Sequence, residues 1–156
     1  MFYSILLLFM MMMMISTNPT SRIPGPFTAT ISYDKEMLAE VQAGRLSMVH
    51  PSHAPKPLWY FNCAIDPNER HEECTIRNSN GNYLSVSPGK AVVLADEAID
   101  EISTWILFKV SFHQQPIGWI FQNKFFRKYL IYDEKTNQVR LSTGTNKKPW
   151  IIDGQM

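Results

Sequence analysis

The sequence predicts an all-β domain built from three copies of one four-stranded unit. A leucine recurs at positions 38, 84 and 130, so both intervals are 46 residues. A tryptophan recurs at positions 59, 105 and 150, at intervals of 46 and 45 residues. Such a period marks a repeated supersecondary unit. Each copy holds four short runs of β-branched and aromatic residues separated by turn formers, which is typical of strands.

The repeated positions also predict the core. Because they recur in the same register in all three units, we expect them to be buried together, although a ligand-stacking role for the tryptophans is the alternative. An aromatic side chain of this size buries about 150–250 Å². The predicted core residues are Leu38, Trp59, Leu84, Trp105, Leu130 and Trp150.

The pattern resembles the β-trefoil superfamily. It is clearest in the middle unit, whose four runs are residues 74–78, 81–84, 91–94 and 104–108. The resemblance covers residues 27–153 and implies a six-stranded barrel capped by three hairpins with pseudo-threefold symmetry. Propellers also use four strands per unit, but they typically need at least about four units. β-Trefoils serve as lectins, protease inhibitors, cytokines and actin binders, so the resemblance leaves the function open.

The chain opens on an apolar run at residues 2–15, which is too short to span a bilayer comfortably as a helix. Residues 1–17 therefore resemble a secretory signal peptide, although no Lys or Arg precedes the run. Secretion is the first hypothesis. If translation instead starts near Met13 or Met14, the protein is cytoplasmic, and a membrane anchor is a third reading. Residues 18–26 hold three prolines and a glycine and are predicted to be a linker.

In the first unit, residues 27–32 alternate apolar and polar side chains, as in a half-buried strand. Residues 35–43 contain good helix formers, but the register with the other units favours a strand there. We expect loops at residues 41–46 and at the proline-rich residues 50–57, and residues 58–61 close the unit.

In the second unit, Asn80-Gly81 is a strong hairpin signal and Pro88-Gly89 predicts the next turn. Residues 95–103 are polar and acidic and are compatible with a helical turn. A connection is predicted at residues 112–118, and a polar loop at 142–148 within the aromatic third unit.

Two cysteines end one unit and begin the next. If their strands lie side by side, Cys63 and Cys74 can form a disulfide around residues 64–73. In the chain-entropy model, closing a loop of this size contributes about 3 kcal/mol. The alternative is two buried free thiols.

Composition excludes several functions. The net charge of +1 provides no basic excess for a nucleic-acid backbone. The sequence has no nucleophile elbow, no Gly-rich phosphate loop and no HExxH motif, so we expect neither an enzyme nor a cofactor. His50 and His53 are three residues apart, but without further ligands they do not predict a metal site.

The leading functional hypothesis comes from a second resemblance. Residues 44–47, 89–94, 101–105 and 137–141 resemble segments of the fungal β-trefoil serine protease inhibitors. In that family the inhibitory loop can lie between the second and third strands of the first unit. The resemblance implies a loop at residues 41–46 with Gly44, Arg45 and Leu46, in which Arg45 pairs with a carboxylate in the protease pocket. Lys56 in the proline-rich loop is a second candidate.

The alternative partner is a glycan. Ricin-type β-trefoil lectins mark their units with Gln-x-Trp, but here Pro57, Ser103 and Lys148 stand where the Gln would be. Asp34 and Asp133 lie near turns, as a sugar-binding aspartate would, and such residues are also ordinary turn formers. The sequence therefore leaves open a lectin with a non-standard sugar site. A scaffold or signalling trefoil with an exposed apolar patch is a third possibility.

Overall fold

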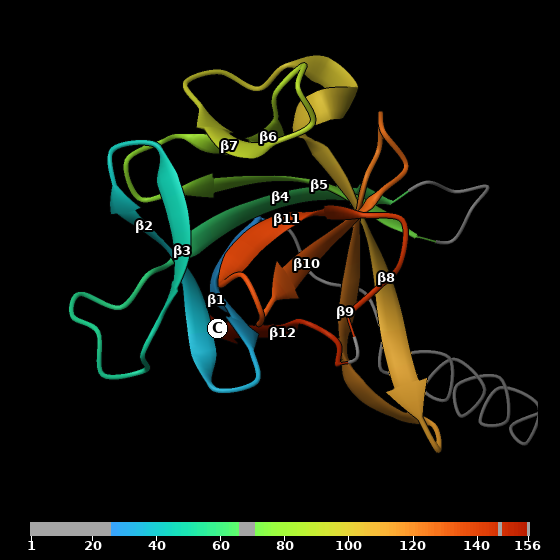
Figure 1. Cartoon of the computed structure of the whole chain (residues 1–156). Coiled ribbons are helices and arrows are strands. Elements are labelled where there is room, and N and C mark those ends of the chain that lie inside the picture. The colour runs from blue at the N-terminus through green and yellow to red at the C-terminus, as the bar shows by residue number, and fades with distance from the viewer. Residues whose placement is uncertain (1–25, 66–70, 147, 156) are drawn as a thin grey trace, which may run out of the picture.

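The computed structural model describes residues 26–65, 71–146 and 148–155, and these form an all-β domain (Figure 1). The predicted targeting segment at residues 1–17 lies outside the described residues, as does the linker at 18–26 except for Pro26. In the described part of the chain, no helix has the length and hydrophobicity needed to cross a membrane.

The described residues form twelve strands and one short 3-10 helix, η1 (Asp100–Ser103), which lies where the sequence allowed a helical turn. The strands are β1 (Phe27–Tyr33), β2 (Glu36–Gln42), β3 (Arg45–Val49), β4 (Trp59–Ile65), β5 (Glu72–Asn78), β6 (Tyr83–Val86), β7 (Val92–Ala95), β8 (Thr104–Phe112), β9 (Gln115–Asn123), β10 (Tyr129–Asp133), β11 (Gln138–Ser142) and β12 (Ile151–Gln155).

Antiparallel pairing joins the strands into one sheet that nearly closes on itself. β4, β5, β8 and β9 follow one another beside β1, and β12 pairs with the other edge of β1. An isolated bridge between Trp119 of β9 and Trp150, just before β12, completes the circuit. The remaining strands form the hairpins β2–β3, β6–β7 and β10–β11, which Figure 1 shows at the left, at the top and in the middle of the view.

Each repeated tryptophan makes the same hydrogen bond. The indole Nε1 of Trp59 donates to the carbonyl oxygen of Leu38 at 2.9 Å. Trp105 donates to Leu84 at 2.8 Å, and Trp150 donates to Leu130 at 2.9 Å. All six residues are at most 2% exposed. The leucines and tryptophans of the three units therefore occupy matching surroundings in the core.

A further set of matched positions completes the core. Ile31, Ile76 and Phe121 follow one another at intervals of 45 residues. All three are fully buried. They come from β1, β5 and β9, the first strand of each unit, so each unit contributes from several strands to one shared interior.

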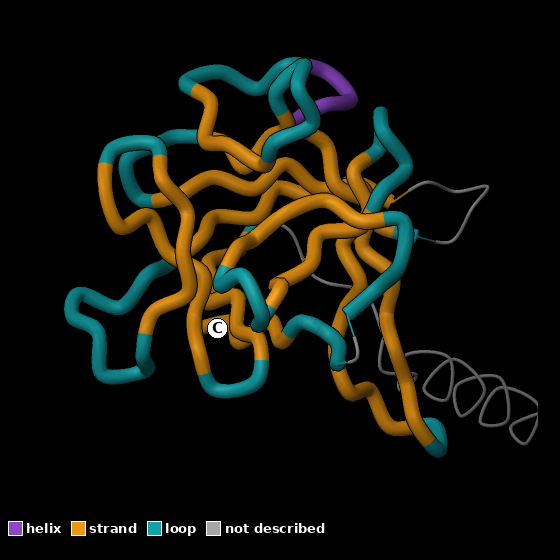
Figure 2. The backbone as a smooth tube through the Cα atoms, in the orientation of Figure 1, coloured by secondary structure: helices purple, strands orange, loops and turns teal. Residues whose placement is uncertain are grey.

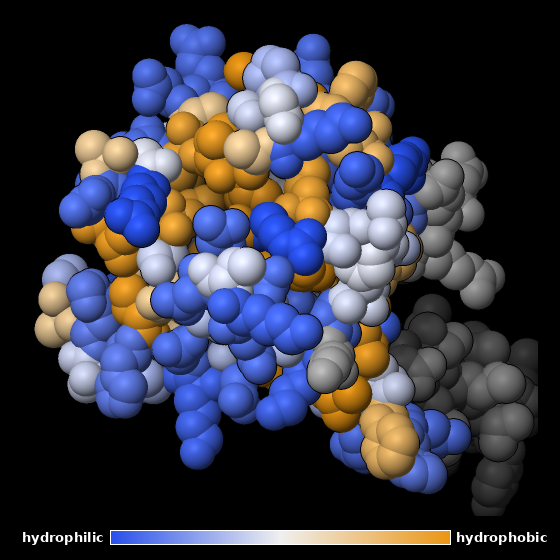
Figure 3. Space-filling view, viewed as in Figure 1, coloured by the Kyte–Doolittle hydropathy of each residue, from blue (hydrophilic) through white to orange (hydrophobic). Residues whose placement is uncertain are grey.

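The three hairpins touch one another at one end of the molecule through half-buried apolar side chains. Figure 3 shows apolar residues gathered between the β6–β7 hairpin and β11. The residues concerned are Leu46 and Met48 of β3, Val92 and Leu94 of β7, and Val139 and Leu141 of β11.

Two predicted connections are wrong. Residues 41–46 are not a loop, because β2 continues to Gln42 and β3 begins at Arg45. Residues 112–118 are also mostly strand, since only His113 and Gln114 separate β8 from β9. Both of these turn residues have positive φ, 48° and 63°, which allows a two-residue hairpin turn without glycine.

The disulfide is one of the two states that the sequence left open for the cysteines. Cys63 of β4 lies directly opposite Cys74 of β5, and their sulfur atoms are bonded. The bridge ties the last strand of the first unit to the first strand of the second. It encloses a short segment, so it stabilises the fold by about 3 kcal/mol in the chain-entropy model.

We expect Trp105→Phe to lower the free energy of unfolding by about 1–3 kcal/mol or more, because the buried carbonyl of Leu84 loses its donor and the smaller ring leaves a void. Urea unfolding followed by circular dichroism measures this change. Trp119→Phe is the matched control, because Trp119 is only half-buried. Equal losses in the two variants would contradict a special role for the indole hydrogen bond.

Candidate functional site

The first predicted site, residues 44–46, lies in a tight hairpin and not in a loop. Gly44, with φ of 74°, takes a left-handed conformation that suits glycine and closes the β2–β3 hairpin in a two-residue turn. Its N–H donates to Glu40 Oε1 at 2.8 Å. Arg45 is exposed but is already paired with Gln42 in the strand ladder, and Leu46 packs partly against the core. Arg45 therefore does not lie on an extended loop, and that part of the prediction is wrong.

The second predicted site is a true loop. Residues 50–58 connect β3 to β4, and Figure 2 shows this loop standing out from the body of the protein. Residues 50–56, including Lys56, are exposed. Hydrogen bonds between Ser52 and the His50 ring, and from the His53 amide to the His50 carbonyl, fold its first half into a turn. Lys56 and His53 border a hollow of about 180 Å³ beside Asn80.

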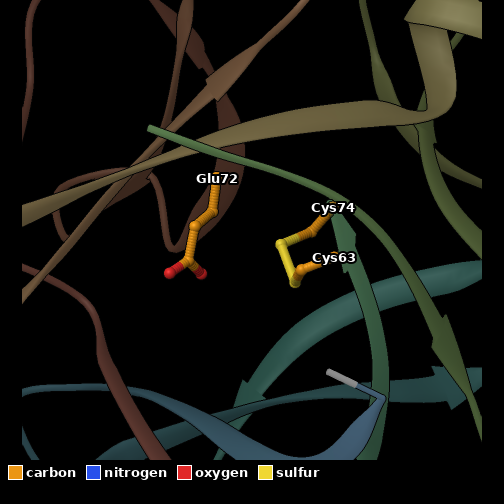
Figure 4. A group of neighbouring side chains, drawn as sticks. All are labelled: Cys63, Glu72 and Cys74. Atoms are coloured by element: carbon orange, nitrogen blue, oxygen red, sulfur yellow. A yellow bond between two sulfur atoms is a disulfide. The ribbon is translucent and has the colours of Figure 1, made fainter. Parts of the chain in front are cut away.

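Among the described residues, one group has the spacing of metal ligands, and it does not include His50 or His53. It consists of Cys63, Glu72 and Cys74, shown in Figure 4. Because the two sulfur atoms are bonded to each other, neither is a thiolate that could bind a metal. Glu72 is buried beside them, at 7% exposure.

An ionic network lies next to the disulfide. Lys124 Nζ is 2.8 Å from Glu73 Oε2, and His71 Nε2 is 3.5 Å from Glu73 Oε1. The hydrogen bond from Lys124, aided by His71, lowers the pKa of Glu73 despite its partial burial. The same bond raises the pKa of Lys124. These groups satisfy one another, so the network serves the fold.

The hollow best suited to a polar ligand lies in the third unit, and we call it the third-repeat pocket. Its volume is about 340 Å³. Tyr33 comes from β1, whereas the other residues belong to the β10–β11 hairpin and the segment after it. The lining consists of Tyr33, Ile131, Tyr132, Asp133, Glu134, Lys135, Arg140, Thr145 and Asn146.

Asp133 and Arg140 form a paired planar group in this pocket. Arg140 donates to Asp133 Oδ2 through Nε and Nη2, both at 3.3 Å. The amides of Lys135 and Thr136 donate to Asp133 Oδ1 at 3.0 and 3.4 Å. Desolvation alone would raise the pKa of Asp133, but these hydrogen bonds together outweigh it and hold the pKa below its usual value. The carboxylate is therefore ionised and held in a fixed orientation.

Two tyrosines supply the apolar part of the pocket. The rings of Tyr33 and Tyr132 meet edge to face, with centroids 5.7 Å apart. Tyr33 also packs against Trp150, so its ring is anchored to the core. The Tyr132 hydroxyl donates to Asn137, and burial together with the nearby Glu36 carboxylate raises its pKa. Tyr132 is therefore neutral at physiological pH.

A larger hollow of about 500 Å³ lies beside Tyr60 on another side of the molecule. There the guanidinium of Arg77 covers the Tyr60 ring, 4.5 Å from its centroid. The ring face that could stack on a ligand is thus already occupied by a cation. This makes the hollow a poorer candidate than the third-repeat pocket.

Sequence reasoning found part of this site. It singled out Asp133 as a turn residue of the kind that lectins use, and the structure confirms the turn. It missed Tyr33, Arg140 and Asn146, which only the pairing of distant strands brings together. Asp34, the other candidate, lies outside the pocket and forms an ion pair with Lys148 at 3.1 Å.

No protein-family model and no curated protein matches this chain. Solved structures do resemble it. A salivary protein from Culex quiquefasciatus of the Cysteine and Tryptophan-Rich (CWRC) family superposes with a TM-score of 0.60 at 19% identity, covering 86% of this chain and 96% of the other. A complex of lysenin with phosphocholine gives a TM-score of 0.57 at 19% identity, again over 86% of this chain.

The lysenin pore gives a TM-score of 0.56 at 18% identity over 86% of this chain. The chain spans 46% of the lysenin chain in the phosphocholine complex and 48% in the pore. At such identities the likeness concerns the all-β fold alone.

We expect Asp133 to titrate below its ordinary pKa of 3.8. Because the folded pKa is lowered, the ionised carboxylate stabilises the turn at higher pH, and this contribution is lost as the pH falls through the folded pKa. NMR can follow the titration through the amide signals of Lys135 and Thr136. Arg140→Gln should move the midpoint upward, whereas a midpoint at or above 3.8 in the unaltered protein would contradict the assignment.

Proposed function

We propose that this protein is a β-trefoil that binds its partner without catalysing a reaction. Three observations support the trefoil: the nearly closed circuit of β1, β4, β5, β8, β9 and β12, the three hairpins beside it, and the indole-to-carbonyl hydrogen bond made in each unit. The absence of catalysis remains a prediction from the sequence motifs.

We further propose that the third-repeat pocket binds a carbohydrate. The observation that carries this proposal is the placement of two tyrosines beside the oriented Asp133–Arg140 pair in one hollow of about 340 Å³. A sugar ring has an apolar C–H face and a rim of hydroxyl groups. Aromatic rings suit that face. A charged planar pair offers both a hydrogen-bond acceptor and donors to adjacent hydroxyls.

The order of these groups suits a sugar that enters from solvent. Tyr33 is buried at the floor of the pocket, at 5% exposure, and Tyr132 is half-buried above it. Arg140, Glu134 and Lys135 are exposed at the rim. An apolar floor with a few oriented polar groups at the edge is the usual composition of a small-ligand site.

A different small polar ligand must be tested beside sugars. Lysenin has been solved in complex with phosphocholine. Tyrosine rings can attract a quaternary ammonium group. In this pocket, however, the carboxylates of Asp133 and Glu134 face the same hollow as the cationic groups, which is less suited to a phosphate. Carbohydrate is therefore the favoured ligand.

We expect the full chain to bind at least one class of glycan on an array, and free monosaccharide to compete with that binding. Arg140→Gln should weaken binding at least about tenfold, because it removes a charged donor from the pocket together with the two hydrogen bonds that orient Asp133. Isothermal titration with the selected monosaccharide measures the change. Arg77→Gln is the matched control, since Arg77 lies at the other hollow.

Three outcomes of these binding experiments would overturn or change the proposal. Loss of binding in Arg77→Gln but not in Arg140→Gln would move the site to the Tyr60 hollow and overturn the proposal. Binding of phosphocholine with no glycan bound would replace the ligand class. No binding of either ligand would remove the proposal altogether.

Protease inhibition is the second candidate, and the loop at residues 50–58 is the observation that favours it. The loop carries Pro51, Pro55 and Pro57, and its residues 50–56, including Lys56, are exposed. A loop whose conformation is already restricted loses less entropy when a protease binds it. The exposed Lys56 would enter a protease pocket that contains a carboxylate.

We expect the full chain to inhibit a trypsin-like protease, and this inhibition to fall at least about tenfold in Lys56→Ala, because one charge-assisted contact is lost. Arg45→Ala should leave inhibition unchanged, since Arg45 is part of a tight hairpin. Inhibition constants measured with a chromogenic peptide substrate provide the comparison. Inhibition that depends on Arg45 and not on Lys56 would contradict this proposal.

A further inference from the structure

An apolar cavity lies against the half of the β8–β9 hairpin that is nearer its turn, beside the third-repeat pocket. Its volume is about 190 Å³. Figure 1 shows this long hairpin extending away from the rest of the sheet. Residues 110–120 of the hairpin form one wall of the cavity, and the segment before β12 forms the other. The apolar lining includes Val110, Ile117, Trp119, Ile120 and Pro149.

The backbone holds these walls together. Trp119 and Trp150 exchange hydrogen bonds between their amides and carbonyls, at 2.8 and 2.9 Å. Between the walls lies Gly118, with φ of 152°, where an added Cβ would be only 2.6 Å from the Trp150 carbonyl oxygen and 2.8 Å from Pro149. The close approach that Gly118 permits keeps Pro149 against the hairpin. The cavity is therefore a fixed feature of the fold.

The polar residues of the lining are Thr145, Asn146 and Lys148, and of these Asn146 is the one that is held in a fixed orientation and only partly exposed. Its Oδ1 accepts a hydrogen bond from the Tyr132 amide at 3.0 Å, which fixes the orientation of the side chain. Its Nδ2 is buried, and no hydrogen-bond acceptor reaches it among the described residues. A buried donor without an acceptor costs free energy, and a ligand that supplies the acceptor recovers it.

The size of the cavity limits the ligand. A dry cavity of about 150 Å³ in another protein accommodates benzene. The present cavity is somewhat larger, so one ring with a small substituent fits. The aliphatic and tryptophan lining favours an apolar body, and Asn146 favours a carbonyl or similar acceptor on it.

We propose that this cavity binds a small aromatic molecule whose carbonyl oxygen accepts a hydrogen bond from Asn146 Nδ2. The site is distinct from the proposed carbohydrate site, although Thr145 and Asn146 form a wall common to both. It goes beyond the proposed function, because its ligand needs no sugar.

The test uses the full chain and two probes of the same shape. Acetophenone carries the acceptor, and α-methylstyrene replaces its oxygen with a methylene group. We expect acetophenone to bind and to shift the side-chain amide signals of Asn146 in a ¹H–¹⁵N NMR titration. α-Methylstyrene should bind at least fivefold more weakly.

Variants separate the polar contact from the cavity itself. Asn146→Asp keeps the acceptor for the Tyr132 amide but removes the donor, so it should abolish the preference for acetophenone. Ile117→Trp fills the cavity from its exposed edge on β9 and should abolish binding of both probes, and Val110→Phe should do the same from the neighbouring strand β8. Ile99→Trp is the matched control, because Ile99 is also an exposed isoleucine but lies beside η1.

Three outcomes would overturn the inference: no binding of either probe up to its solubility limit, equal affinity for the two probes in the unaltered protein, or binding that survives both cavity-filling variants. A failure of the carbohydrate experiments leaves these measurements unaffected. Loss of probe binding likewise says nothing against sugar binding, so the two proposals fail independently.

Discussion

The hydrogen bond from a tryptophan indole to a leucine carbonyl, made once in each unit, is the constraint on which the rest of the structure depends. Both partners are buried, so an alternative register would leave a polar group without a partner in an apolar interior. The bond joins the segment at the start of the fourth strand of each unit to its second strand. It therefore sets how each hairpin lies on the barrel-like sheet, and with it the positions of the loops that carry the candidate sites.

The core was predictable from the sequence because burial recurs with the period of the unit. Leu38, Trp59 and their equivalents are large, apolar and regularly spaced, and the all-β class followed from the same pattern. The turns were harder to predict. Residues 41–46 and 112–118 contain Gly and Pro, which suggest loops, yet two-residue turns at Gly44 and at His113–Gln114 let the strands continue through them. Local composition cannot distinguish a long loop from a tight turn between long strands.

The third-repeat pocket was predictable only in part, for a physical reason. Asp133 belongs to a turn that local sequence can indicate. Tyr33 belongs to β1, which is far from β10 in the sequence. It reaches the same hollow because β1 pairs with β12, which follows the third-unit hairpin in the chain. Contacts of this kind depend on closure of the sheet, which single-sequence patterns do not record. The segment between β11 and β12 then serves two hollows at once, since Asn146 borders both.

The pairing of β1 with β12 has a consequence for how the molecule reaches its native state. Thr30 and Asp153, which hydrogen-bond across this pair, are 123 residues apart in the chain. Long-range pairing of this kind requires a large loss of chain entropy before the new contacts stabilise the chain. Topologies rich in such contacts therefore fold slowly. The hairpins can form early from neighbouring residues. The pairing of β1 with β12 is then expected to be a late step. Until it occurs, the free edges of these two strands would be open to pairing with another chain.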